Sequence, residues 1–351
     1  MRIAQVAPLH EAVPPNLYGG TERIVSYLTE ALMALGHDVT LFASGDSQTS
    51  ADLDPVWPRA LRLDPVLRDP IPPLMLQLER VRERAHEFDV LHFHLDYWPF
   101  SLFSRQSTPF LTTLHGRLDL PELKPIFAAF PGAHLVSISN AQRRPLPEAQ
   151  FMETVQHGLP EELLSPCADV APHYFAFLGR IAPEKGPDAA IRIARRCGIP
   201  LKIAAKIDRA DQDYFEEIIR PMLNEPGVEL VGEINERDKS AFLSGALALL
   251  MPINWPEPFG LVMIEAMACG TPVIAFDRGS VREVLEDGVT GWVVRDDSEA
   301  VGAAARLDGL SRAGIRERFR ARFTARRMAE DYLRLYRSIG ARSRTALRAI
   351  G

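Results

Sequence analysis

The sequence predicts an α/β fold of two doubly wound, parallel-sheet domains that face each other across a cleft. Three observations indicate this fold class. Short β-rich runs alternate with helix-periodic runs along the whole chain, which is the rhythm of a parallel sheet. That rhythm stops once, at a proline-rich stretch between residues 158 and 172 that we interpret as a linker, and then starts again. The length of 351 residues agrees with two domains.

The first half of the chain opens with a strand over residues 2–7. Helix-periodic apolar residues follow from Glu22 to Leu35, and Gly36 is a typical helix stop. Further strands are expected at residues 38–43, 89–94, 109–115, 134–139 and 151–156. We therefore predict a first domain over residues 1–165.

The second half repeats the pattern. Strands are expected at residues 174–179, 201–206, 228–232, 246–252, 272–276 and 292–294. Helical runs are expected at residues 187–197, 213–223, 239–243 and 261–268. We predict a second domain over residues 172–325, and a last helix, within about 326–351, that packs back on the first domain.

The composition is that of an ordinary globular protein, with 46% hydrophobic and 25% charged residues. A net charge of -6 does not favour nucleic acid as a partner. The three cysteines, Cys167, Cys197 and Cys269, are far apart and form no C-x-x-C pair, which favours free thiols over disulfides or a zinc site. We expect no metal site and no cofactor.

A cytoplasmic protein is expected, because the first residues lack the apolar segment of a signal peptide. The longest nearly apolar stretch, residues 241–253, is too short to span a bilayer. Residues 306–351 hold thirteen Arg, no Lys and four acidic residues, a local charge of +9. This basic end is interpreted as a solvated helix, with peripheral contact to the inner face of a membrane as the alternative.

Open α/β sheets bind ligands beyond the carboxyl ends of their strands, so the loops after the strands are the places to search. Gly19-Gly20-Thr21-Glu22 precedes the first helix, where paired glycines allow a close backbone approach to an anion. The alternative is a tight turn capped by Thr21. No G-x-G-x-x-G occurs here, so a dinucleotide cofactor is poorly supported.

A second candidate loop follows the first strand of the second domain, at residues 179–186. It holds Arg180 and Lys185. A guanidinium offers a planar fork to phosphate oxygens, and a lysine offers a mobile point charge. The loop therefore predicts an anionic ligand, against the alternative of two surface cations.

The third candidate is the most specific, because two carboxylates flank the start of a helix. Glu257 precedes that start, and Glu265 lies further along the helix. The free N–H groups at Gly260, Leu261 and Val262 suit a phosphate. The carboxylates suit sugar hydroxyls, so the pair predicts a sugar nucleotide. The alternative is a capping glutamate beside an unrelated surface one.

Histidines and aromatic residues follow the strands of the first domain. His115 ends a strand and faces the expected cleft, where it could contact a sugar hydroxyl, or it could be structural. His92 and His94 share one strand face, but they lack a third ligand for a metal, and we favour packing or an acceptor wall. The segment 96–98, Asp-Tyr-Trp, is a candidate acceptor pocket.

These motifs together resemble one known family. Gly19-Gly20, the loop 179–186 and the segment 257–265, with its Pro-Glu-Pro-Phe-Gly start, are similar to the retaining glycosyltransferases of family 4. The resemblance covers the chain from residue 1 to about 340. It implies the GT-B fold of two Rossmann-like domains, with the acceptor at the first domain and the nucleotide-sugar donor at the second.

The resemblance also implies roles for the charged residues. Arg180 and Lys185 would neutralise the donor diphosphate, Glu257 would bind the transferred sugar, and Glu265 would hold the ribose hydroxyls. His115 would lie near the sugar. Backbone or packing contacts with the donor are implied for Gly19, Gly20, Ile234, Phe259, Gly260 and Leu261.

The implied reaction is retaining, metal-independent transfer of a hexose, with UDP-glucose as the first candidate donor. The acceptor stays open among sugars, lipids and small metabolites; some relatives of this length resemble pterin glucosyltransferases. A sugar-nucleotide epimerase or a phosphorylase on the same fold, and a non-catalytic nucleotide-sugar-binding module, are the alternatives. The oligomeric state is not predicted.

Overall fold

The computed structural model describes residues 1–16, 19–224 and 226–350, with side chains up to residue 340. The chain forms two compact units. Unit 1 comprises Met1–Gly158 and Ala325–Gly351, and unit 2 comprises Leu159–Thr324. The stretch interpreted as a linker starts inside unit 2, because Leu159 and Leu164 are buried there and the Leu159 amide donates to the Phe323 carbonyl over 2.9 Å.

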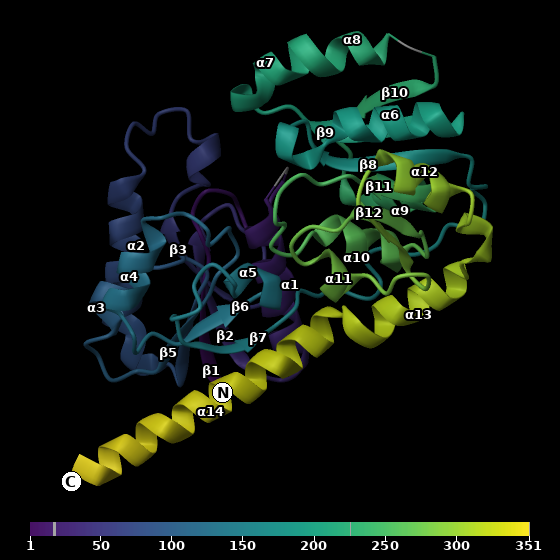
Figure 1. The fold of residues 1–351 in the computed structure, drawn as a ribbon. Helices are drawn as coiled ribbons and strands as arrows, with labels where there is room; N and C mark the ends of the chain where they lie inside the picture. The colour runs from purple at the N-terminus through teal and green to yellow at the C-terminus, as the bar shows by residue number, and fades with distance from the viewer. Residues whose placement is uncertain (17–18, 225, 351) are drawn as a thin grey trace. The chain divides into compact units, whose positions relative to one another are not determined.

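Unit 1 is built on a seven-stranded sheet in the order β3-β2-β1-β4-β5-β6-β7, with every neighbouring pair parallel (Figure 1). The strands are β1 (Arg2–Val6), β2 (Asp38–Ser44), β3 (Asp52–Trp57), β4 (Val90–Phe93), β5 (Phe110–Thr113), β6 (Leu135–Ser137) and β7 (Phe151–Thr154). Strands covered on both faces are mostly apolar, and all four residues of β4, His92 among them, are buried.

The helices of unit 1 include a long C-terminal one. They are α1 (Gly20–Ala34), α2 (Ile71–Arg84), α3 (Phe100–Phe103), α4 (Leu123–Ala129), α5 (Asn140–Arg143) and α14 (Ala325–Ile350). α14 packs against α1 and buries Tyr332 and Tyr336 in unit 1. The last helix is thus an integral part of unit 1, although it follows the whole of unit 2 in the sequence.

Unit 2 holds a six-stranded parallel sheet in the order β10-β9-β8-β11-β12-β13. The strands are β8 (Tyr174–Arg180), β9 (Leu201–Lys206), β10 (Val228–Gly232), β11 (Ala246–Met251), β12 (Val273–Phe276) and β13 (Gly291–Val294). The helices are α6 (Pro187–Cys197), α7 (Gln212–Tyr214), a π-turn (Phe215–Ile219), α8 (Arg220–Leu223), α9 (Glu236–Ser244), α10 (Leu261–Ala268), α11 (Val281–Val284), α12 (Asp297–Ala304) and α13 (Arg312–Arg322).

Each sheet reverses its winding direction at one place. In unit 1 the reversal lies between β1 and β4, and in unit 2 it lies between β8 and β11. The loops after those two strands diverge there and leave room beyond the sheet edge, which is where doubly wound folds bind ligands.

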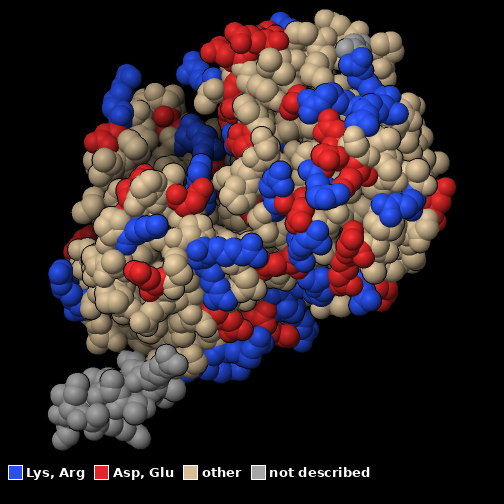
Figure 2. All heavy atoms as spheres, in the orientation of Figure 1, with Lys and Arg blue, Asp and Glu red and all other residues tan. Residues whose placement is uncertain are grey.

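The arginine-rich end of the chain differs from its interpretation as a solvated helix. Arg312, Arg316 and Arg322 of α13 donate to backbone carbonyls of unit 2, and Arg327 of α14 donates to the carbonyls of residues 156 and 157. These four side chains therefore stabilise the fold. Arg342, Arg344 and Arg348 lie outside the described side chains. Over the face drawn in Figure 2, basic and acidic side chains are interspersed.

Candidate active site

The predicted donor residues of unit 2 lie at its winding reversal. Lys185 comes from the loop after β8, and Glu257 comes from the loop after β11. The Lys185 ammonium donates to Glu257 Oε2 over 2.7 Å, and the Trp255 indole N–H donates to the same oxygen over 3.0 Å. The ammonium also lies 5.1 Å from the centre of the Trp255 ring. The structure thus joins residues that are 72 positions apart.

Backbone contacts hold these two loops together. The Asn254 amide donates to the Glu184 carbonyl over 2.8 Å. Gly186, with a φ of 69°, brings its Cα so close to Pro252 that a Cβ would overlap the Pro252 carbonyl oxygen. A side chain at Gly279 would likewise overlap the backbone of Glu257. The position of Lys185 relative to Glu257 is therefore set by close backbone packing.

Helix α10 begins at Leu261, four residues after Glu257. Its N-cap is Gly260, with a φ of 80°, and the Ser280 hydroxyl donates to the Phe259 carbonyl over 2.9 Å. The first N–H groups of a helix have no acceptor inside the helix, so the backbone at Gly260 and Leu261 offers donors beside the Glu257 carboxylate. Phe259 is buried and anchors the helix start.

Arg180 ends β8 and is surrounded by carboxylates. Its guanidinium contacts Glu184 at 2.6 Å, Asp211 at 3.1 Å and Asp208 at 3.5 Å. A diphosphate that binds Arg180 must therefore compete with these carboxylates. Sequence reasoning named Arg180 but missed its acidic partners, because Asp208 and Asp211 follow the next strand.

Glu265 lies inside α10 and is buried. Its Oε1 accepts a hydrogen bond from the Lys239 ammonium over 2.7 Å, and Lys239 also contacts Glu236 at 3.1 Å. Lys239, on α9, was not predicted as a site residue. Little in the sequence indicated it, since Lys239 is a single lysine on a short helix and belongs to no recognisable motif. Ile234 is half-buried in the loop that leads to α9.

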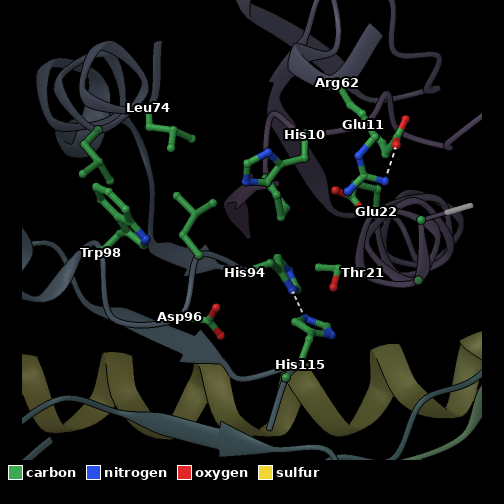
Figure 3. Close-up of a pocket in the computed structure, with 16 residues that line it drawn as sticks. His10, Glu11, Thr21, Glu22, Arg62, Leu74, His94, Asp96, Trp98 and His115 are labelled. Carbon is green, nitrogen blue, oxygen red and sulfur yellow. Dashed lines mark hydrogen bonds and ion pairs between the residues drawn. The ribbon is translucent and has the colours of Figure 1, made fainter. Parts of the chain in front are cut away.

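The remaining predicted site residues belong to unit 1. Gly19 and Gly20, at the start of α1, and His115, after β5, line a cavity of about 360 Å³ (Figure 3). His94, after β4, lines it too, and its Nδ1 lies 2.8 Å from His115 Nε2. The two glycines and His115 thus share one cavity, and the hydrogen bonds given above for Lys185, Glu257 and Glu265 are to residues of unit 2.

His92 and His94 belong to a buried polar cluster under this cavity. His92 contacts the Tyr336 hydroxyl and the Thr113 hydroxyl, each at 2.7 Å. His94 Nε2 contacts the Gln5 amide oxygen at 2.9 Å. Burial lowers the pKa of His92 and of His94 well below the ordinary histidine value, so both rings are neutral at pH 7. The structure supports packing as the main role of His92.

No group of three or more His, Cys, Asp or Glu side chains within residues 1–16, 19–224 and 226–340 has a geometry that could hold a metal ion. None of the helices in the described part of the chain has the length and apolar character that crossing a membrane requires.

Comparisons with known proteins agree with this architecture. The family model for glycosyl transferases group 1 matches residues 168–324, and the model for glycosyltransferase family 4 matches residues 18–153. Phosphatidyl-myo-inositol mannosyltransferase of Mycobacterium leprae is 25% identical over 97% of this chain and 97% of its own length.

Two solved structures show the same fold over nearly the whole chain. Sucrose-phosphate synthase from Thermosynechococcus elongatus superposes with a TM-score of 0.81, at 22% identity, over 97% of this chain and 99% of its own. The Anabaena protein HepE, in complex with UDP-glucose, superposes with a TM-score of 0.73, at 17% identity, over 96% of this chain and 100% of its own.

Two Rossmann-like, parallel-sheet units are the architecture of the GT-B fold. The chain belongs to the glycosyltransferases of group 1 and family 4, whose two domain models together cover most of its length. It is therefore a transferase enzyme, and the predicted family and fold class are confirmed. The roles of the individual residues toward a donor stay predictions.

Proposed function

We propose that this enzyme moves a hexose from a nucleoside-diphosphate sugar to an acceptor hydroxyl, with retention of the anomeric configuration. The observation that carries the proposal is the bonded pair of Lys185 and Glu257 beside the N-terminus of α10. A cation and helix N–H groups suit a diphosphate, and a carboxylate next to them suits sugar hydroxyls. One site thus offers cationic and N–H donors to the diphosphate of a sugar nucleotide and a carboxylate acceptor to its sugar.

In this proposal, Lys185 and Arg180 stabilise the charge that develops on the leaving diphosphate, without a metal ion. The bond between the sugar C1 and the phosphate oxygen breaks, and the electron pair leaves with the diphosphate. A bond from C1 to the acceptor oxygen forms on the same face, and the hydroxyl proton passes to the departing phosphate. Glu257 holds the sugar, and Glu265 holds the ribose, for which it would share its carboxylate with Lys239.

UDP-glucose is the first candidate donor. HepE, which shares the fold, was crystallised with it, and the family resemblance of the motifs points the same way. The acceptor stays open among lipids, sugars and small metabolites. The lipid in the name of the mannosyltransferase relative keeps peripheral membrane contact among the candidates. The site residues of unit 2 support a prediction about the donor but carry no information on the acceptor.

A thermal-shift screen tests the donor assignment. The wild-type chain is heated with UDP, GDP and ADP and with their glucose or mannose conjugates. A ligand that binds only the folded state at 100 times its Kd adds about 2.7 kcal/mol of stability, so the true donor raises Tm by several degrees. If no nucleotide sugar raises Tm, the proposal of a sugar-nucleotide site is wrong.

A further inference from the structure

A continuous chain of hydrogen-bonding side chains runs through the interior of unit 1. It starts at His115, which lines the cavity of this unit, and it ends on the C-terminal helix α14. Contacts of 2.7–3.1 Å join its seven members in this order: His115, His94, Gln5, Tyr336, His92, Thr113 and Tyr332. His115 is half-buried and every other member is at most 3% exposed, so the protein itself determines the hydrogen-bond pattern of the chain.

The three histidines of this chain are neutral at pH 7. Burial lowers the pKa of His92 and of His94 well below the ordinary value, and it lowers the pKa of His115 to about 3. A neutral imidazole has one N–H donor and one lone-pair acceptor. A ring that accepts a hydrogen bond at one nitrogen must therefore donate from the other, so each ring transmits the direction of the chain.

Gln5 sets that direction, because a carboxamide has a donor end and an acceptor end. Its Oε1 lies 2.9 Å from His94 Nε2, and its Nε2 lies 3.1 Å from the Tyr336 hydroxyl. An amide oxygen only accepts, so His94 Nε2 carries a proton and His94 Nδ1 holds a lone pair. His115 Nε2 lies 2.8 Å from this lone pair and must donate to it. The other ring nitrogen of His115, Nδ1, is consequently an acceptor.

The same direction holds on the other side of Gln5. The Tyr336 hydroxyl accepts the amide N–H and donates to His92 Nδ1 at 2.7 Å. His92 Nε2 then donates to the Thr113 hydroxyl at 2.7 Å, and Thr113 donates to the Tyr332 hydroxyl at 2.8 Å. If the Gln5 amide were turned over, every one of these bonds would reverse, so the chain has one direction at a time.

The His115 ring is held in place by two neighbours. Its face stacks on the His157 ring, with 5.3 Å between the ring centroids and 16° between the planes, and its Nε2 is bonded to His94 (Figure 3). Within the described residues, no hydrogen bond is found for His115 Nδ1. The lone pair of this nitrogen is therefore the polar group that the ring offers to a ligand.

We propose that Gln5, His94 and Tyr336 are positioning residues that keep His115 a hydrogen-bond acceptor toward the substrate. His115 then accepts a hydrogen bond from a substrate hydroxyl and does not give a proton to the leaving phosphate. Through Tyr336, the helix α14 acts on a cavity that it does not line. The substrate in this inference rests on the proposed glycosyl transfer, but the protonation of the rings can be measured without any transfer.

The first test is long-range proton–nitrogen NMR of the full chain at pH 7, which shows which nitrogen of each ring carries a proton. Signals are assigned by replacing one histidine at a time. His92, His94 and His115 are all expected to be protonated at Nε2 and unprotonated at Nδ1. Protonation of any of the three at Nδ1 overturns the proposal. No donor or acceptor is added, so this result does not depend on whether the enzyme transfers a hexose.

The second test breaks the chain beside Gln5. In Tyr336→Phe the amide loses its hydroxyl partner and can face either way, so His115 is expected to populate both protonation forms. The kcat/KM for release of the nucleoside diphosphate should fall in proportion to the fraction still protonated at Nε2, about twofold if the two forms are equal. Tyr174→Phe is the matched control, because the buried Tyr174 hydroxyl donates to the Phe242 carbonyl in unit 2, and it should change neither quantity.

Two results with a folded Tyr336→Phe would overturn the proposal. An unchanged His115 ring would show that Tyr336 does not hold the Gln5 amide. A changed ring with wild-type kcat/KM would show that the protonation form of His115 does not serve the reaction. If this variant does not fold, the spectrum of the wild-type chain decides the matter. Thermal stabilisation by nucleotide sugars reports separately on the donor site, so a failure of each proposal is recognisable.

Discussion

Hydrogen bonds within the protein already orient the Glu257 carboxylate without a ligand. Two donors from different positions, the Lys185 ammonium and the Trp255 indole N–H, bind the same oxygen, Oε2. The side chain is 11% exposed, so it has little freedom to move, and among the described residues no hydrogen bond is found for its other oxygen, Oε1. Such preorganisation lowers the cost of binding a polar ligand.

Replacement of Lys185 tests the cationic role. Lys185→Ala is expected to reduce kcat/KM for sugar transfer by about a hundredfold to a thousandfold, the usual effect of removing one preorganised donor. Rates are measured as release of the nucleoside diphosphate. Lys202→Ala is the matched control, because Lys202 pairs with Glu229 on the sheet edge of the same unit. If Lys185→Ala transfers sugar at the wild-type rate, the assignment of Lys185 to the donor site is wrong.

The pair of Lys239 and Glu265 is expected to contribute strongly to the stability of unit 2. Both side chains are at most 10% exposed, so Lys239→Met leaves a buried carboxylate without its cation. Removing one partner of a buried ion pair costs about 3–5 kcal/mol. Urea unfolding measures this loss, and a double variant with Glu265→Leu should regain part of it. If Lys239→Met and the double variant are equally stable, the two side chains are not energetically coupled.

Sequence reasoning located the residues with a motif and missed their partners. Glu257, Glu265, Arg180 and Lys185 were expected because they occur in loops after strands or at a helix start. Lys239 was not expected, since the contact with Glu265 spans 26 positions and joins two helices. The contact between Gln5 and His94 spans 89 positions. Periodicity and loop motifs carry no information on such tertiary contacts.

At the scale of elements, α13 is held in place by its arginines. Arg316 is 8% exposed and donates to the carbonyls of Leu164, Ala268 and Glu161 at 2.5–2.7 Å. The Ala268 carbonyl ends α10, where the helix leaves its last carbonyls unsatisfied. One guanidinium thus ties α13 to α10 and to the first residues of unit 2.

The variant Arg316→Met tests this interpretation. Three carbonyls lose a charged donor, and the expected destabilisation of unit 2 is about 3 kcal/mol or more. Arg318→Met on the same helix is the control, because Arg318 is 52% exposed and has a salt bridge of 3.4 Å with Glu286. Chemical denaturation of both proteins gives the comparison. A solvated role for Arg316 predicts instead that the two variants are equally stable.

Most strands were predictable, whereas the strand β3 and the helices α2, α3, α4 and α5 of unit 1 were not. The strands β9 and β10 and the helices α6 and α10 begin and end at the predicted residues. The strand β3 was missed because it lies at the sheet edge and contains Asp52, Asp54 and Pro55, which are poor strand formers. The helix α2 was missed because it begins Ile-Pro-Pro and exposes Met75 and Leu76, which obscures its periodicity.

At the scale of the whole molecule, the buried histidines are concentrated in unit 1. His92, His94 and His157 are each at most 4% exposed, and burial lowers the pKa of each ring below the ordinary value of 6.5. The unfolded chain therefore binds more protons than the folded chain below pH 6.5. Stability is complete above that pH and is lost as the pH falls.

Hydrogen exchange measures this pH dependence in each unit separately. Each buried neutral histidine should cost about 1.4 kcal/mol per pH unit below pH 6.5. His115, whose pKa burial lowers to about 3, adds to these three, so the four together should cost about 5–6 kcal/mol per pH unit. After correction for intrinsic exchange, the protection of β4 and β5 should fall between pH 6.5 and 5.5. Unit 2 is the internal control, because its single histidine is the exposed His173. A uniform loss in both units would contradict a histidine origin.

The most direct test of the donor site is a crystal structure of the full chain with UDP-glucose. We expect the diphosphate within hydrogen-bond distance of Lys185 Nζ and of the first N–H groups of α10, with the hexose on the Glu257 carboxylate. The ribose hydroxyls should lie on Glu265. A nucleotide sugar bound elsewhere, with the contact between Lys185 and Glu257 unchanged and no ligand atom beside it, would rule out this donor site.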